Sequence, residues 1–169
     1  PSTWLFAAKP YQAQHVLAQY LDGSCRVYID QQSFITKGIK ILIPNYDEAR
    51  LNAVEVPTPY SAVLDTHLAQ ANCANPVDYL DIGDHLRYRA IVDFLRGLAS
   101  CSRPDLAYTT AKLLQAWDCP CLPLLQSAER VLVYLWQTQR LSLSCPAFNP
   151  YFPRKRGVFY ANSLHVRLL

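Results

Sequence analysis

Hydrophobic residues recur at helical spacing in three successive segments of residues 85–141, here called the three-helix block. Each segment carries one apolar stripe, so three helices are predicted to bury these stripes against one another. Pro104 suits the first turn of the second helix, with Ser102 as its cap. The predicted inward positions are Leu86, Ala90, Phe94 and Leu98 with Ile91 and Leu95 in the first helix, Leu106, Leu113 and Trp117 in the second, and Leu124, Ala128, Val131 and Leu135 in the third.

The chain before this block is predicted to hold a short strand, a helix and a long connection. Residues 25–29 alternate between apolar and polar, as expected for a strand. Apolar residues return at helical spacing from Gln31 to about Leu42, and Pro44 ends that helix. Prolines punctuate residues 44–84, which we interpret as an irregular connection that wraps a missing partner surface.

These patterns predict a mainly α fold with minor β content, an α+β class. We divide the chain into a strand–helix segment at 1–43, the connection at 44–84, the three-helix block at 85–141 and a proline-rich, basic tail at 142–169. The tail begins as a loop, and only residues 158–169 alternate as a strand would.

Composition narrows the class of protein. With 51% hydrophobic and 17% charged residues, the chain can bury a core and is not expected to be disordered. The net charge of +3 permits nucleic-acid binding without requiring it. No apolar run reaches the roughly 18 residues that a membrane span needs. We see no secretory signal, so we expect free cysteines and an intracellular protein, and the lack of Met suggests a piece of a longer chain.

Three segments of the three-helix block resemble motifs of the copia-type retrotransposon polyprotein. Residues 88–92, YRAIV, are similar to its Y-R-x-[IL]-[VI], residues 102–106, SRPDL, to its [TS]-R-P-D-[IL], and residues 130–135, RVLVYL, with Thr138, to its R-[VI]-L-R-Y-L-x-G-T. Order and spacing match, and weaker matches extend the likeness to roughly residues 20–143. The motif residues that the resemblance marks are Tyr88, Arg89, Arg103, Pro104, Asp105, Arg130, Tyr134 and Leu135.

The resemblance places this stretch in the reverse transcriptase, in the thumb and connection that follow the polymerase palm and precede ribonuclease H. The palm holds divalent metal ions with paired aspartates, and no Asp-Asp pair occurs in this sequence. The resemblance therefore implies a catalytically inactive fragment of an RNA-directed DNA polymerase, with no cofactor of its own. Its partners would be a nucleic-acid duplex and the remainder of the polyprotein or of a larger assembly.

Thumb helices of polymerases follow the duplex backbone, so basic side chains here are candidate contacts to an RNA–DNA or DNA duplex. The alternative is an ordinary solvated face, and for Arg103 a structural corner paired to a carboxylate. The candidates are Lys37, Lys40, Arg87, Arg89, Arg96, Arg103, Arg154, Lys155 and Arg156.

The three-helix block also departs from the family pattern. Asp93 and Gln137 stand where the family has glycine, Gly97 where it has tyrosine, and Leu124-Leu125 where it has His-Trp. Such changes fit a fragment adopted as a non-catalytic structural subunit of a larger assembly, or a decayed reading frame without function. These two hypotheses stand beside that of duplex grip.

Other catalytic or metal chemistry finds little support in the sequence. The CPC sequence at 119–121 lacks a second pair of zinc ligands at the usual spacing. Asp78, Asp81 and Asp84 beside His85 could collect a cation, but acidic residues also favour a helix start, which is the interpretation we adopt. No nucleophile elbow or glycine-rich phosphate loop occurs. We therefore predict no catalytic residue and no metal site.

Overall fold

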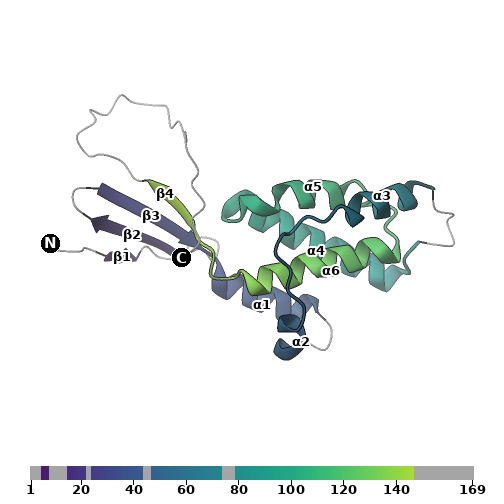
Figure 1. Cartoon of the computed structure of the whole chain (residues 1–169), viewed down its shortest axis with the longest axis horizontal. Helices are drawn as coiled ribbons and strands as arrows, with labels where there is room; N and C mark the ends of the chain where they lie inside the picture. The colour runs from purple at the N-terminus through teal and green to yellow at the C-terminus, as the bar shows by residue number, and fades with distance from the viewer. Residues whose placement is uncertain (1–4, 8–14, 22–23, 44–46, 74–78, 147–169) are drawn as a thin grey trace, which may run out of the picture. The chain divides into compact units, whose positions relative to one another are not determined.

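The computed structural model describes residues 5–7, 15–21, 24–43, 47–73 and 79–146, and Figure 1 shows its helices and strands. The chain folds as two compact units: residues 1–34 with 140–169, here called the sheet unit, and residues 35–139, here called the helical unit. As predicted, the fold is mainly helical with minor β content. No helix within the described residues is both long and apolar enough to cross a membrane.

The sheet unit contains a four-stranded antiparallel sheet in the order β1-β2-β3-β4. Its strands are Leu5–Ala7 (β1), His15–Leu21 (β2), Ser24–Asp30 (β3) and Leu143–Pro146 (β4). β3 confirms the predicted strand over residues 25–29. β4 lies where we predict a loop, because its pairing with β3 joins segments far apart in the sequence and leaves no local signal.

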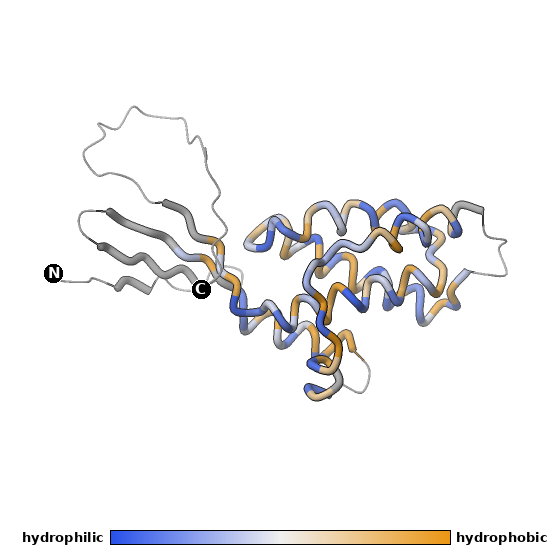
Figure 2. The backbone as a smooth tube through the Cα atoms, viewed as in Figure 1, coloured by the Kyte–Doolittle hydropathy of each residue, from blue (hydrophilic) through white to orange (hydrophobic). Residues whose placement is uncertain are grey.

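Helices build the second unit. They are α1 (Gln32–Leu42, in this unit from Ile35 onward), α2 (Glu48–Asn52), α3 (Val63–Cys73), α4 (Ile82–Cys101), the 3-10 turn η2 (Pro104–Leu106), α5 (Ala107–Leu114) and α6 (Leu122–Gln137). The predicted helix after β3 and the three predicted helices of the block are confirmed, and every predicted inward position of the third is buried in α6. Figure 2 shows hydrophobic and hydrophilic residues interchanging along these helices, as expected when each buries one face.

The buried face of α4 agrees with the predicted one only in part, because Ile91, Leu95 and Leu98 are buried as predicted and the other three predicted positions are not. Its buried residues are Tyr88, Ile91, Val92, Leu95 and Leu98. Of the predicted inward set, Leu86 is 62% exposed, Ala90 is exposed and Phe94 is half-buried. α4 carries apolar residues at helical spacing along two lines, and its packing against η2, α5 and α6 selects the line through Leu95.

The connection at 44–84 is not irregular, because α2 and α3 lie within it. Leu64, Leu68 and Ala71 form a buried stripe on α3, which packs against α5 and α6. The described part of this segment covers α6 of the same unit, so the irregularity from which we predict the wrapping of a partner is not found there. Pro57 and Pro59 precede α3 and do not interrupt it, so they were no obstacle to a helix there.

The capping residues of α4 confirm one prediction made from the sequence and contradict another. Asp81 caps the first turn, because its carboxylate accepts the N–H of Asp84 at 2.8 Å, which confirms the helix-start interpretation. Ser102 closes the same helix by donating its N–H to the Leu98 carbonyl at 3.0 Å. The predicted role of Ser102 as a cap of the next helix is therefore wrong, and Pro104 opens η2 ahead of α5.

Gly97 offers a test of helix stability within α4. It is exposed, and a Cβ added there would meet no atom within 4 Å. Because glycine costs a helix interior about 1 kcal/mol relative to alanine, Gly97→Ala should raise the free energy of urea unfolding by about that amount. Gly38→Ala is the matched control and should lower the free energy of unfolding, since its Cβ would overlap the Phe94 ring. An unchanged or lower stability for Gly97→Ala would contradict this account.

Candidate functional site

The predicted phosphate contacts of α4 do not share one surface. At 3.6 residues per turn, Arg89 and Arg96 lie on one side of the helix and Arg87 lies on the opposite side. Arg87 donates to the Leu42 carbonyl at 3.2 Å and pairs with Glu129, so it links α4 to both α1 and α6. The charge of Arg87 therefore serves the packing of the helical unit.

Arg89 and Arg96 have carboxylate partners at the surface. Arg89 pairs with Asp118 at 3.1 Å, and its guanidinium lies over the Trp117 ring, 4.8 Å from the ring centroid. Arg96 pairs with Asp93 at 2.8 Å, so this departure from the family pattern has a local electrostatic role. A phosphate would have to compete with these carboxylates for either guanidinium.

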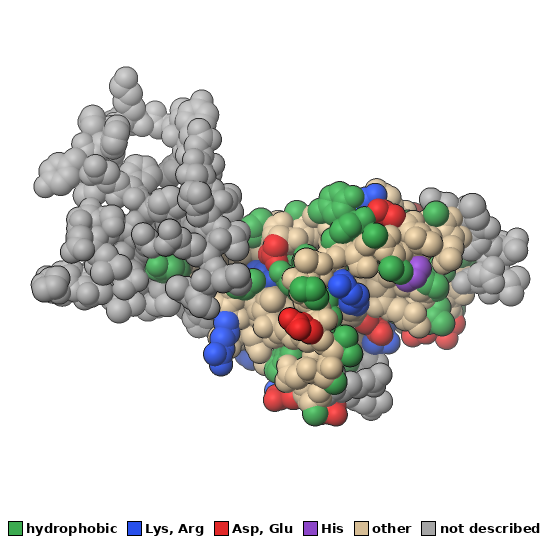
Figure 3. Space-filling view, viewed as in Figure 1, with side chains coloured by type: hydrophobic (Ala, Val, Ile, Leu, Met, Phe, Trp, Pro, Cys, Tyr) green, Lys and Arg blue, Asp and Glu red, His purple; other side chains and the backbone are tan. Residues whose placement is uncertain are grey.

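Charge is distributed unevenly between the two units. Residues 35–139 contain nine Lys and Arg against eleven Asp and Glu, a net charge of −2. The remaining residues contain seven against two, a net charge of +5, so the basic excess of the chain lies outside the helical unit. Lys37 and Lys40 are exposed on α1, and the candidates at 154–156 lie outside the described residues. Figure 3 shows basic and acidic side chains interspersed on the visible face of the helical unit.

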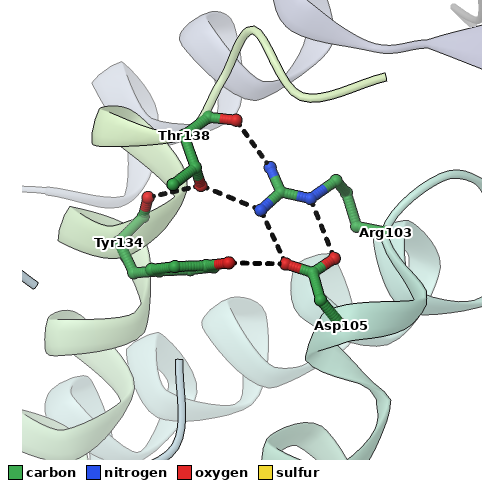
Figure 4. Close-up of polar contacts among 4 residues, drawn as sticks. All are labelled: Arg103, Asp105, Tyr134 and Thr138. Carbon is green, nitrogen blue, oxygen red and sulfur yellow. Dashed lines mark hydrogen bonds and ion pairs between the residues drawn. The ribbon is translucent and has the colours of Figure 1, made fainter. Parts of the chain in front are cut away.

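Arg103 is only 2% exposed and lies between η2 and the end of α6 (Figure 4). Its Nε and Nη2 donate to the two carboxylate oxygens of Asp105 at 3.0 and 2.8 Å. Its Nη1 donates to the Thr138 carbonyl at 3.0 Å, and Nη2 also donates to Thr138 Oγ1 at 2.8 Å. Four hydrogen bonds engage a group that has five N–H donors. The alternative of a structural corner is confirmed, and the phosphate interpretation of Arg103 is wrong.

Tyr134 completes this corner. Its hydroxyl donates to Asp105 at 2.9 Å, and Thr138 Oγ1 donates to the Tyr134 carbonyl at 2.7 Å. Burial by itself would raise the pKa of Asp105, but the Arg103 guanidinium and the Tyr134 hydroxyl hold that pKa below its usual range. Burial and the neighbouring carboxylate raise the pKa of Tyr134. The corner therefore keeps a charged pair inside the fold and ties η2 to the C-terminal end of α6.

Two other motif residues also join elements of the helical unit. Tyr88 is buried and donates its hydroxyl to the Leu113 carbonyl at 2.6 Å, and burial raises the pKa of Tyr88. Arg130 donates from Nη1 to the carbonyls of Thr58 and Pro59 at 3.1 and 3.3 Å. These contacts join α4 to α5, and α6 to the segment before α3.

Gln137 is a structural residue that sequence reasoning missed, because its only signal there is a departure from the family pattern. Its Nε2 donates to the carbonyls of Leu51 and Val54 at 2.8 and 2.6 Å, and its Oε1 accepts the N–H of Val56 at 2.9 Å. We call these three bonds the Gln137 clamp. The sequence feature that could have indicated this role is a long polar side chain at the end of an apolar helix, at a position where the family has glycine.

The described residues contain no group of three or more His, Cys, Asp or Glu side chains that could hold a metal ion. His85 contacts the Trp117 carbonyl through Nε2 at 3.0 Å, and Cys101, Cys119 and Cys121 are free thiols. No family model, curated protein or solved structure matches the chain. The geometry defines a mainly helical module whose charged motif residues hold its elements together.

Proposed function

We propose that the chain is a non-catalytic fragment of a copia-type reverse transcriptase, equivalent to its thumb and connection. One observation carries the proposal: residues from all three resembling motifs form the hydrogen-bonded frame of the helical unit. Tyr88 of the first motif joins α4 to α5. Arg103 of the second motif joins η2 to α6, and Arg130 of the third joins α6 to the segment before α3. A chance likeness would not be expected to coincide with the side chains that hold the helices together.

In this proposal the helical unit is a frame, and the duplex contacts lie mainly elsewhere. The net charge of −2 and the carboxylate partners of Arg87, Arg89 and Arg96 leave this unit poorly suited to collect phosphates. The contacts we propose are the exposed Lys37 and Lys40, near the start of the helical unit, and the basic residues 154–156 outside it. The divalent ions of the parent family would act at the palm, so we assign no cofactor to this chain.

Binding to a labelled RNA–DNA hybrid tests the proposal. The full chain should bind with a Kd on the order of micromolar at low salt, and log Kd should rise steeply with log salt concentration. Replacing Arg154, Lys155 and Arg156 together with glutamate should weaken binding and reduce the salt slope by about 0.7 to 0.9 for each phosphate that the variant no longer neutralises. The Lys37→Glu, Lys40→Glu double variant should do the same to a smaller extent.

Arg89→Glu with Arg96→Glu is the matched control on the helical unit. These residues already face Asp118 and Asp93, so this double variant should leave the salt slope unchanged. Equal loss of affinity in all three variants would mean that the chain responds only to net charge. No hybrid binding at low salt would reject duplex grip.

A second candidate function is that of a structural subunit adopted into a larger protein assembly. The Gln137 clamp favours it, because a decayed reading frame has no reason to build three hydrogen bonds where the family has glycine. The negative charge of the helical unit also suits a protein partner better than a nucleic acid. This function would be supported if the chain does not bind the RNA–DNA hybrid but unfolds in urea in one cooperative transition. Absence of a cooperative transition would point to a relic.

A further inference from the structure

A pocket of about 280 Å³ lies in the helical unit between α3, α5, α6 and the segment before α3. Val63 and Leu64 of α3 and Val131 of α6 supply apolar walls. The volume lies just below the range of roughly 300 to 1,000 Å³ that is usual for ligand pockets, so it suits a small molecule or one residue of a peptide. Of the residues in the three resembling motifs, Arg130 and Val131 line it.

Five uncharged or titratable polar side chains also line this pocket, and the hydrogen bonding of three of them, His67, Thr109 and Ser127, bears on what it could bind. His67 Nδ1 lies 2.8 Å from Ser127 Oγ, and Ser127 Oγ donates to the Pro123 carbonyl at 3.0 Å. The Ser127 hydroxyl has a single proton, so the tautomer of His67 that donates from Nδ1 is the one compatible with both hydrogen bonds of Ser127. Thr109 is 1% exposed, and its hydroxyl has no hydrogen-bond partner among the described residues. A buried hydroxyl without a partner carries a desolvation cost that a bound polar group would relieve.

Arg130 is the one charged side chain that lines the pocket. Arg87, Arg89, Arg96 and Arg103 each face a carboxylate, whereas no carboxylate among the described residues pairs with Arg130. Its hydrogen bonds to backbone carbonyls hold the guanidinium in place without neutralising it.

The nearest acid on α3 does not neutralise this charge either. Asp65 is engaged by Lys112 at 2.9 Å and by the Tyr60 hydroxyl. The pocket therefore combines apolar walls, one positioned and uncompensated cation, and one buried hydroxyl in need of a partner. An anion with a small apolar group satisfies all three features.

We propose that this pocket binds a carboxylate carrying a small branched aliphatic group, either as a free acid or as the C-terminal residue of a peptide. The planar guanidinium of Arg130 suits the two oxygens of a carboxylate. Val63, Leu64 and Val131 contact the aliphatic group, and Thr109 offers a further hydrogen bond. This inference does not depend on the proposed function: it concerns a ligand in the pocket beside Arg130, and neither duplex binding nor the bonds of Arg130 to Thr58 and Pro59 require that pocket to be occupied.

Calorimetric titration of the full chain with three probes tests the proposal. The probes are 4-methylpentanoate, N-acetyl-leucine and N-acetyl-leucinamide. Both acids should bind with a Kd on the order of millimolar, as expected for such small ligands. The amide should bind about tenfold more weakly or not at all, because it lacks the charge that Arg130 recognises. Tighter binding of 4-methylpentanoate would identify the free acid, and tighter binding of N-acetyl-leucine the peptide terminus.

Variants locate the binding to this pocket. Arg130→Gln should weaken both acids about tenfold, and Arg130→Lys should restore part of the affinity, with Arg89→Gln as the matched control outside the pocket. Val63→Phe fills the pocket without touching Arg130 and should abolish binding even where an Arg130 variant folds poorly, whereas Val54→Phe at another exposed valine should not. Equal affinity for the amide and the acids, unchanged binding in Val63→Phe, or failure of both acids to saturate would overturn the proposal.

Discussion

Replacing Arg103 with alanine is expected to lower the free energy of unfolding by about 3 to 5 kcal/mol. The substitution leaves the Asp105 carboxylate within the fold without its guanidinium partner and removes both bonds to Thr138. The loss of stability exceeds the net contribution of the pair, because the half-buried carboxylate that remains is partly desolvated and has lost its guanidinium partner. Urea unfolding of the parent chain and the variant near neutral pH measures it.

Arg96→Ala is the control for a generic loss of positive charge. It removes an exposed partner of Asp93 on a neighbouring helix turn and should cost at most about 1 kcal/mol. A cost for Arg103→Ala as small as that of Arg96→Ala would contradict the description of a buried guanidinium paired to a half-buried carboxylate. The comparison matters for function because Arg103 belongs to the motif on which the family resemblance rests.

The same corner has a pH signature. Because the pKa of Asp105 is lowered in the folded state, its pairing contributes stability above the ordinary carboxyl pKa of about 4. That contribution is lost as the pH falls through the lowered pKa of the folded state. The cost of Arg103→Ala should therefore shrink as unfolding is measured from neutral pH down to about pH 3. A cost that stays constant over this range would mean that Asp105 is not the carboxylate that Arg103 stabilises.

Replacing Gln137 with alanine is expected to cost about 2 to 3 kcal/mol, from three hydrogen bonds that contribute about 1 kcal/mol each. The Gln137 amide bonds two backbone carbonyls and one backbone N–H. In the alanine variant the carbonyls of Leu51 and Val54 and the N–H of Val56 lose this partner and can bond only to water. Hydrogen exchange adds a local reading, because the Val56 amide should lose protection in the variant. Urea unfolding gives the global cost.

Gln126→Ala is the matched control for the Gln137 clamp. Gln126 lies on the same helix, is exposed and should change the free energy of unfolding by less than about 0.5 kcal/mol. If Gln137→Ala matched this control and Val56 kept its protection, the clamp would not stabilise the fold. The proposal of a fragment adopted as a structural subunit would then lose its main support.

Local sequence signals were sufficient wherever an element is defined by its own near neighbours. β3, α1, α4 and α6 follow from alternation or helical spacing, and the cap at Asp81 follows from an acidic residue before an apolar run. The pairing of Arg103 to a carboxylate could be anticipated as an alternative because Asp105 lies two residues away. These features depend on interactions within a few residues, and such interactions leave a pattern in the sequence.

Sequence-based prediction failed where two patterns in one segment favoured different structures, or where the interacting residues are far apart in the chain. Pro57 and Pro59 favour an irregular segment, and this outweighed the apolar spacing of Leu64, Leu68 and Ala71, which form the buried stripe of α3. α4 has two lines of apolar residues, and Leu86 belongs to the line that is not buried. The pocket beside Arg130 combines residues of three helices, so no single stretch of sequence contains it.

The sequence by itself determined the mainly helical class, most helix positions and the absence of an Asp-Asp pair. Only the tertiary structure decided which stripe of α4 is buried, that Arg103 is bonded to Thr138, and that Gln137 clamps the segment that ends at Val56. The physical reason is one of range. Periodicity, capping and composition act through neighbouring residues, whereas burial and hydrogen-bond partnership in these cases join positions that only the folded chain brings together.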